Sequence, residues 1–151
     1  MSDYNSQMLE AFVQKNDKLE FYKTTFANFD SIKSFTKKWK WSWMAFLGSF
    51  WFFLYRKSYI NALMLFIICA LVSFIPILML IVFILNGGFA MYFIHKTYKD
   101  KKLKYESTES EDKMRIALMK YHGGVHFWVI PVYFAFVILS FVQGLMSNVP
   151  N

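Results

Sequence analysis

Charged residues are missing from the longest apolar part of this sequence. No Asp, Glu, Lys or Arg occurs from Ser58 to Ile94, and Arg56-Lys57 and His95-Lys96 bound this run. A charge-free stretch of that length excludes an ordinary small soluble domain and predicts an integral membrane protein. As one helix it would be about 55 Å long, which is too long for a single crossing of the bilayer.

Cysteine is almost absent, and a cleavable leader is not recognisable. The only cysteine, Cys69, lies inside the apolar run, so we expect it to be a small packing residue without a disulfide. Residues 1–6 are polar and are not followed by an apolar core, which predicts that no cleavable signal peptide is present. Insertion would then depend on the internal spans.

Positive charge lies beside the apolar runs. The formal net charge is +7, and every charged residue falls before Ser58 or between Ile94 and Tyr121. Juxtamembrane Lys and Arg hold their segments on the cytoplasmic side and attract anionic headgroups, so the bilayer is a predicted partner. There is no arginine-rich tail or nucleic-acid motif, and nucleic acid is not a predicted partner.

The N-terminal segment, 1–36, is expected to form cytoplasmic amphipathic helices. Its apolar residues recur at three-, four- or seven-residue steps, which is typical of one helical face. These residues are Met8, Phe12, Leu19, Tyr22, Phe26 and Phe29. Asn16-Asp17 interrupts the pattern, and Asp17 with Glu20 resembles a capping box, so we predict helices over 5–15 and 18–29.

Tryptophan and lysine alternate at the start of segment 37–57, as is typical of a membrane interface. The uncharged part, 41–55, is about 22 Å long as a helix and has Gly48-Ser49 in its middle, where a helix can bend. An interfacial or re-entrant helix fits better than a spanning one, with a tilted short span as the alternative. The candidate lipid or interface contacts are Trp39, Trp41, Trp43, Trp51, Tyr55, Arg56 and Lys57.

Proline predicts a transmembrane hairpin over 58–95. Pro76 lies near the centre and disfavours helix at the residue before it, which gives arms of 58–75 and 77–94 with both positive flanks on the cytoplasmic side. The competing turn is at 86–88, Asn-Gly-Gly, which has better turn chemistry but leaves a short second arm. With the turn at Pro76, Gly87-Gly88 are small residues that allow close helix contact.

The rest of the chain is predicted to cross the membrane once more. Residues 96–124 read as a cytoplasmic loop, in which Thr108 and Glu111 form a capping box for a helix over 109–121 that ends at Gly123-Gly124. Residues 125–146 form the last span, and 147–151 a tail.

No catalytic or metal-binding constellation is recognisable. His122 and His126 have the spacing of two ligands on one helical face, but glycines separate them and a third ligand is missing nearby. No acid lies within a span, and the Gly-Gly pair lacks the phosphate-binding patterns. We therefore expect no enzyme, cofactor or metal. The polar residues of the spans are too few to line a pore in a monomer, although an oligomer could assemble one.

The stretch 41–59, WSWMAFLGSFWFFLYRKSY, resembles the hallmark of the bacterial domain of unknown function 2628 family. That pattern runs aromatic-Asn-Trp-Ala-Ala-Phe, then Gly-Pro-Phe-Trp, then Tyr-Arg-Lys-Met-Tyr. Residues 12–16 (FVQKN) with Phe21-Tyr22, and 88–92 (GFAMY), are also similar, so the resemblance covers most of 11–125. The chain departs from the family pattern at Gln14, Ser42, Ser49 and Ser58. The resemblance implies a small bacterial inner-membrane protein without an established activity or catalytic residues.

These observations together predict an all-α, multi-pass membrane protein with its N-terminus in the cytoplasm. We expect N-terminal amphipathic helices, an interfacial or re-entrant aromatic helix, a transmembrane hairpin and a final span. The predicted role is a non-enzymatic accessory or organising component of a membrane complex, with a protein partner or a homo-oligomer. The alternative is an oligomeric channel, small transporter or holin-like pore, and an interfacial lipid enzyme is least favoured.

Overall fold

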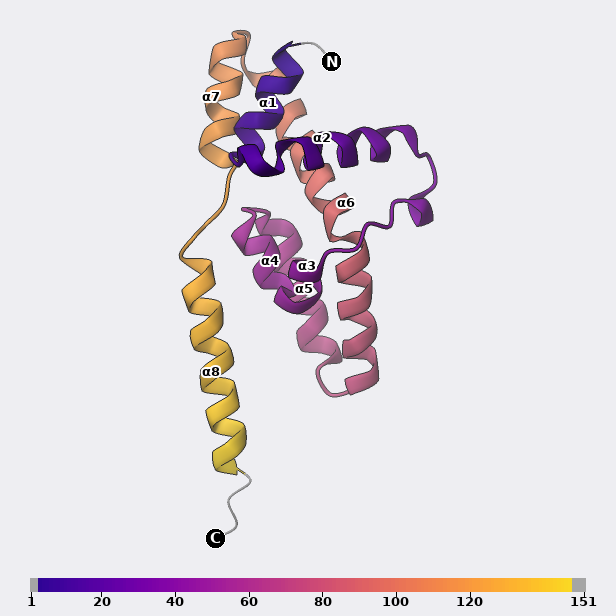
Figure 1. The fold of residues 1–151 in the computed structure, drawn as a ribbon, viewed down its shortest axis with the longest axis vertical. Helices are drawn as coiled ribbons and strands as arrows, with labels where there is room; N and C mark the ends of the chain where they lie inside the picture. The colour runs from indigo at the N-terminus through magenta and orange to yellow at the C-terminus, as the bar shows by residue number, and fades with distance from the viewer. Residues whose placement is uncertain (1–2, 148–151) are drawn as a thin grey trace.

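The computed structural model describes residues 3–147 and is built from helices (Figure 1). These residues contain no strand, which confirms the all-α prediction. The elements are α1 (Asp3–Val13), α2 (Asn16–Ser31), the short 3-10 helix η1 (Phe35–Lys37), α3 (Trp43–Gly48), α4 (Phe50–Tyr55), α5 (Tyr59–Val72), α6 (Pro76–Thr108), α7 (Asp112–His122) and α8 (Val129–Ser147).

The molecule divides into a charged half and an apolar half, which are joined by α6. The charged half consists of α1, α2, α7 and the second part of α6, at the top of Figure 1. Met8, Phe12 and Met119 are fully buried there, and the Phe12 ring lies 5.2 Å from that of Tyr98 on α6. The apolar half, residues 41–55, 58–94 and 123–147, contains no Asp, Glu, Lys or Arg.

The N-terminal helices form as predicted, but they begin and end at slightly different residues. The expected 5–15 and 18–29 are observed as α1 and α2, and the predicted capping box is wrong. The residue before α2 is Lys15, which makes no side-chain cap, so Asp17 already lies within the first turn. Gln14 has φ 53°, and this left-handed residue separates the two helices without a cap.

Pro76 separates α5 from α6, and the competing turn at 86–88 is wrong. Pro76 is the first residue of α6, where its missing N–H leaves no helical hydrogen bond unmade. Asn86, Gly87 and Gly88 lie inside α6 and are buried. The small size of Gly87 and Gly88 allows the predicted close approach: Phe46 of helix α3 lies against Gly87, and the segment before α3 lies against both glycines.

The predicted loop at 96–124 is helical over most of its length. α6 continues through the lysine-rich stretch to Thr108, because no glycine or proline interrupts it after Gly88. The second capping box is also wrong. Thr108 is still in α6 and its Oγ1 donates to Lys104 O, while Glu111 precedes α7 without making a side-chain cap.

The tryptophan segment folds into two short helices that reverse the chain. α3 ends at Gly48 and α4 begins at Phe50, so the predicted bend at Gly48-Ser49 is confirmed. Ser49 has φ 46° and ψ −128°, a backbone conformation that ordinary L-residues avoid. α3 packs on α6 and α4 packs on α5, so the chain enters and leaves this pair in opposite directions (Figure 1).

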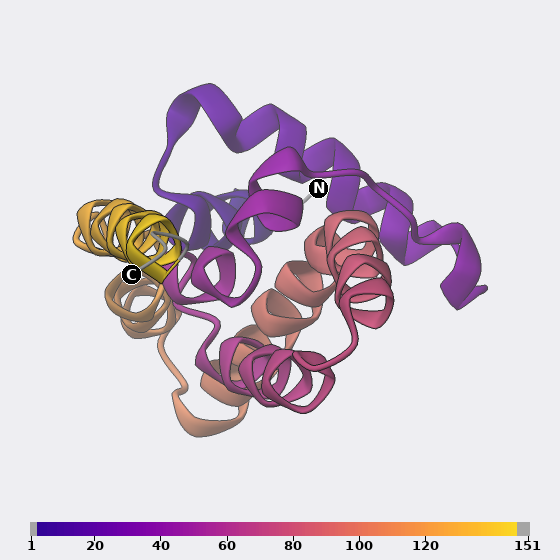
Figure 2. The same cartoon turned by 90° about the horizontal axis from the view of Figure 1, so that it is seen from below.

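The last helix begins four residues later than predicted and lies at the edge of the molecule. α8 touches α4, and seen from below it stands apart from the α5–α6 pair (Figure 2). α6 and α8 are long and apolar enough to cross a membrane, and α5 is a shorter apolar helix. Of the predicted tail, residues 148–151 lie outside the described part of the chain.

Candidate functional site

The corner between α4 and α5 carries the three residues Tyr55, Arg56 and Lys57. Lys57 has φ 54°, and the backbone N–H of Ser58 donates to Phe53 O at 2.8 Å, which closes a tight reversal. The carbonyl oxygen of Tyr55 accepts from the backbone N–H of His126 at 2.9 Å. Hydrogen bonds therefore connect the corner to α4 and to the segment before α8. The corner lies at the boundary between the charged and apolar halves.

Arg56 points into the protein, not toward solvent. It is 4% exposed, and its guanidinium lies 4.8 Å from the centre of the Tyr22 ring and 5.7 Å from that of Phe12. Within residues 3–147, its Nε and Nη2 have no hydrogen-bond partner. Arginine stays protonated in proteins, so the buried Arg56 guanidinium carries a positive charge. The two aromatic rings compensate only part of the cost of burying that charge.

Further cations lie close to Arg56. We call Lys15, Arg56, Lys57 and Lys101 the cationic cluster. None of the four forms an ion pair with a described residue, although acids on α2, α6 and α7 form such pairs elsewhere. Lys101 Nζ instead donates to the carbonyl oxygen of His122 at 2.7 Å.

The cationic cluster affects the pKa of its member Lys101 and of the neighbouring Tyr22. Lys101 lies in the charged part of α6, beyond the apolar run, and burial together with Lys57 and Arg56 lowers its pKa to about 8. On α2, burial raises the pKa of the Tyr22 hydroxyl, and the positive charge of Arg56 opposes that rise. Burial is the largest cause of both shifts, and the neighbouring cations add to the lowering at Lys101 and oppose the rise at Tyr22.

A cavity of about 350 Å³ opens beside the cationic cluster. Its walls include Lys15, Lys18, Tyr22 and Arg56 on the charged side, and the cavity also contacts Asp17. Lys15 Nζ donates to Tyr55 Oη at 3.0 Å, which places that ammonium group at the cavity wall. The remaining walls are Ser42 and apolar or aromatic side chains of α1, α2, α3, α4, α6 and the segment before α3.

Trp39 and Trp41 lie against α6, and the ring of Trp43 contacts that of Trp41. Trp39 and Trp43 are 43% and 66% exposed, while Trp41 is half-buried between them. The backbone N–H groups of Lys40 and Ser42 donate to Gly88 O and Gly87 O, both at 2.8 Å. The exposed faces of Trp39 and Trp43 are accessible to lipid at a membrane interface. The lipid contact of these rings stays a prediction.

The other predicted contacts are divided between surface and interior. Trp51 is half-buried, with its ring centre 6.2 Å from that of Tyr133 on α8. Lys57 is half-buried, whereas Tyr55 and Arg56 are buried. The structure thus brings Lys15, Lys18 and Tyr22 to Arg56. Sequence reasoning missed these partners, because only the tertiary packing of α2 on the corner makes them neighbours.

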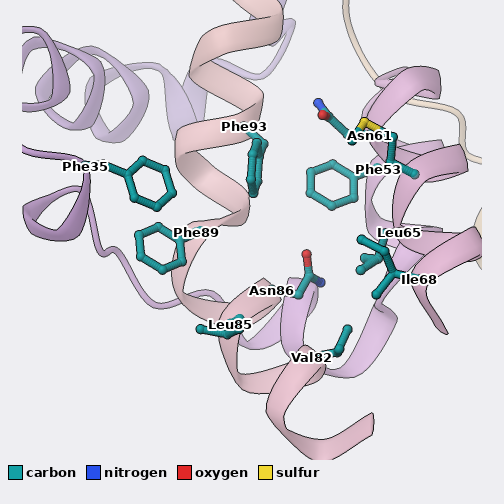
Figure 3. Close-up of a pocket in the computed structure, with 11 residues that line it drawn as sticks. Phe35, Phe53, Asn61, Leu65, Ile68, Val82, Leu85, Asn86, Phe89 and Phe93 are labelled. Atoms are coloured by element: carbon teal, nitrogen blue, oxygen red, sulfur yellow. The ribbon is translucent and has the colours of Figure 1, made fainter. Parts of the chain in front are cut away.

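A second cavity, of about 390 Å³, lies between α5 and α6 and is almost wholly apolar (Figure 3). Phenylalanine rings and aliphatic side chains surround it, and Asn61 and Asn86 are its amide residues. The Asn86 amide nitrogen donates to Ala45 O at 2.6 Å, so it holds α3 against α6. The cavity wall includes no acid, histidine or nucleophilic pair on which catalysis could be built.

The histidines that the sequence singled out make separate contacts. His122 Nδ1 lies 3.1 Å from Leu118 O in its own helix, and His126 Nε2 lies 2.6 Å from Tyr59 Oη. α7 ends at His122, as the glycines after it predict. Among the described residues, no group of three or more His, Cys, Asp or Glu side chains is placed to hold a metal ion.

Comparison with known proteins returns no relative. No family model matches the chain, and neither the curated proteins nor the solved structures contain a match. The resemblance to the domain of unknown function 2628 family therefore stays a prediction based on the residues at 41–59.

Proposed function

We propose that the protein is a multi-pass protein of the bacterial cytoplasmic membrane and a non-enzymatic organising component of a membrane complex. The observation that carries this proposal is the division of the molecule into a charged and an apolar half. Large apolar side chains of α5, of the first part of α6 and of α8 are exposed. An apolar surface of this extent is stable in lipid and not in water.

Helix lengths agree with this placement. The apolar part of α6, residues 76–94, and α8 with its 19 residues would each be about 28 Å long, close to the thickness of a thin bilayer. α5 has 14 residues and would be about 21 Å long, which is shorter than the hydrocarbon core, so the bilayer would have to thin beside it. Because α3 and α4 reverse the chain, the chain would enter the membrane at α3 and leave it at α4 on the same, cytoplasmic side, so that the two helices form a re-entrant pair.

The organising role is supported by the position of α8. Its side chains Leu139 and Phe141 are 68% and 67% exposed, and the helix touches the remainder of the described chain mainly through α4. Such a helix has a free apolar face for a helix of another protein. The charged half would remain outside the bilayer and supply a second surface.

Cysteine labelling tests the topology. In a Cys69→Ala background, we would introduce Ser73→Cys beside the α5–α6 turn, Ser107→Cys near the end of α6 and Ser147→Cys at the end of α8. All three positions are exposed. A membrane-impermeant maleimide applied to intact spheroplasts should label positions 73 and 147, and should label 107 only after lysis. Labelling of 107 in intact spheroplasts, or release of the protein by alkaline carbonate, would contradict the proposal.

Site-specific photocrosslinking tests the organising role. A photoreactive phenylalanine at position 141 on α8 should yield a discrete adduct with one other membrane protein. The matched control is position 60 on α5, where Ile60 is similarly exposed but is expected to face lipid. A series of adducts between copies of this chain would instead favour the pore alternative. Equal adduct yields at both positions would contradict a partner specific to α8.

A further inference from the structure

Arg56 is a buried cation that the protein itself does not neutralise. It is 4% exposed, its Nε and Nη2 have no partner within residues 3–147, and it forms part of the wall of the 350 Å³ cavity described above. Losing water from a guanidinium is costly unless hydrogen bonds or a counter-charge replace it. The two aromatic rings beside it supply only part of that compensation.

The charge at the cavity wall remains positive after its one acid is counted. Lys15, Lys18 and Arg56 contribute cations, and Asp17 contributes the carboxylate. Asp17 is largely exposed and lies 3.8 Å from Lys18 Nζ, so it pairs with that lysine and not with Arg56. Lys15 and Arg56 are therefore left as two cations at one wall, an arrangement that is stabilised by an anion with several acceptor oxygens.

An apolar groove adjoins this cavity. The groove has a volume of about 390 Å³ and runs between the α3–α4 pair and the start of α8. Met44, Phe52 and Tyr55 line both the groove and the cationic cavity, so the two spaces are neighbours. The remaining groove walls are Leu47, Gly48, Trp51, Val129, Ile130, Tyr133 and Phe134.

We propose that these two spaces form one binding site for an anionic phospholipid. The headgroup phosphate lies at Lys15 and Arg56 and accepts hydrogen bonds from the ammonium and guanidinium groups. One acyl chain follows the groove along α3, α4 and α8. A free phosphate would use only the cationic part, whereas a phospholipid matches both the charge and the apolar walls. This site rests on the proposed membrane location.

Thermal unfolding in dodecyl maltoside tests the site. The single cysteine, Cys69, is buried, so a thiol-reactive dye reports unfolding. Saturating dioleoylphosphatidylglycerol should raise the Tm by about 5 °C or more, because a ligand that binds only the folded state stabilises it. Dioleoylphosphatidylcholine, glycerol phosphate and inorganic phosphate are the comparison probes and should give much smaller shifts. Equal shifts with glycerol phosphate or inorganic phosphate would overturn the lipid assignment in favour of a free phosphate.

Substitutions connect the shift to the named residues. Arg56→Met and Lys15→Gln should each reduce the phosphatidylglycerol shift by more than half. Lys113→Gln on α7 removes the same charge from an exposed position and should leave the shift unchanged. Without lipid, Arg56→Met should be at least as stable as the original protein, because a buried charge that the two rings compensate only in part is removed. If Arg56→Met does not fold, Lys15→Gln still decides the result.

The possible results distinguish a failure of the lipid site from a failure of the proposed membrane location. A full shift in both Arg56→Met and Lys15→Gln would overturn the site, even where cysteine labelling gives the expected topology. Conversely, if labelling contradicts the topology but inorganic phosphate gives an Arg56-dependent shift, the membrane proposal fails and the anion site is a phosphate site.

Discussion

Gly88→Ala tests how closely the tryptophan segment packs on α6. A Cβ built at Gly88 would lie 2.5 Å from Cε2 of Trp39, whereas carbon atoms in contact are about 3.5–4.0 Å apart. The Trp39 ring must therefore move by about 1 Å or more. The backbone beside it is held by the 2.8 Å hydrogen bond from Lys40 N to Gly88 O, so the ring has to rotate away from the helix.

The expected loss of stability follows from three contributions. Overpacking a close contact costs about 1–3 kcal/mol. Rotation of Trp39 also weakens its ring contacts with Phe89 at 5.1 Å and Trp41 at 6.2 Å, together about 1 kcal/mol. Alanine favours the helix over glycine by about 1 kcal/mol, which offsets part of the loss. We expect Gly88→Ala to lower the free energy of unfolding by about 1–3 kcal/mol.

Unfolding by SDS in mild detergent, followed by labelling of Cys69, measures this change. Gly48→Ala is the matched control, because a Cβ there would meet Phe52 Cβ at an ordinary 3.6 Å. The double variant with Trp39→Ala is decisive. In that background Gly88→Ala should be neutral or stabilising by up to about 1 kcal/mol, since only the helix preference remains. An equal loss in both backgrounds would refute the proposed clash.

Three other substitutions each test one local feature: a strained backbone angle, a hydrogen bond and a lowered pKa. Ser49→Gly should stabilise the protein by about 1 kcal/mol, because glycine adopts the observed φ of 46° without strain, and a lower SDS midpoint would contradict this. Asn86→Leu should lose about 1–2 kcal/mol with the hydrogen bond to Ala45 O, and an unchanged midpoint would be the contrary result. The pKa of Lys101 is lowered from 10.5 to about 8, so the unfolded chain binds more protons between these values and the Tm should rise as the pH increases through that range. Lys101→Met should remove that part of the rise, and an unaltered pH profile would contradict the assignment.

Local patterns in the sequence were sufficient for most helices. The apolar stripe of the N-terminal segment, the charge-free run and Pro76 predicted α1, α2, α5 and the start of α6, because periodicity and proline act on neighbouring residues. The capping boxes failed for the opposite reason. A Ser, Thr or Asp followed by Glu is common, and whether it begins a helix depends on where the previous helix ends. At Thr108 the preceding helix had not yet ended.

The sequence by itself determined most of the helices, although not the continuation of α6 to Thr108, and how charge is separated from apolar surface along the chain. It also identified Tyr55, Arg56 and Lys57 as distinctive. Only the tertiary structure decided that Arg56 points inward, that Lys15 and Tyr22 reach it, and that an apolar groove begins next to it. The physical reason is distance along the chain. Helix periodicity relates residues a few positions apart, whereas this site joins α2, α4 and α8, whose relative placement depends on side-chain packing.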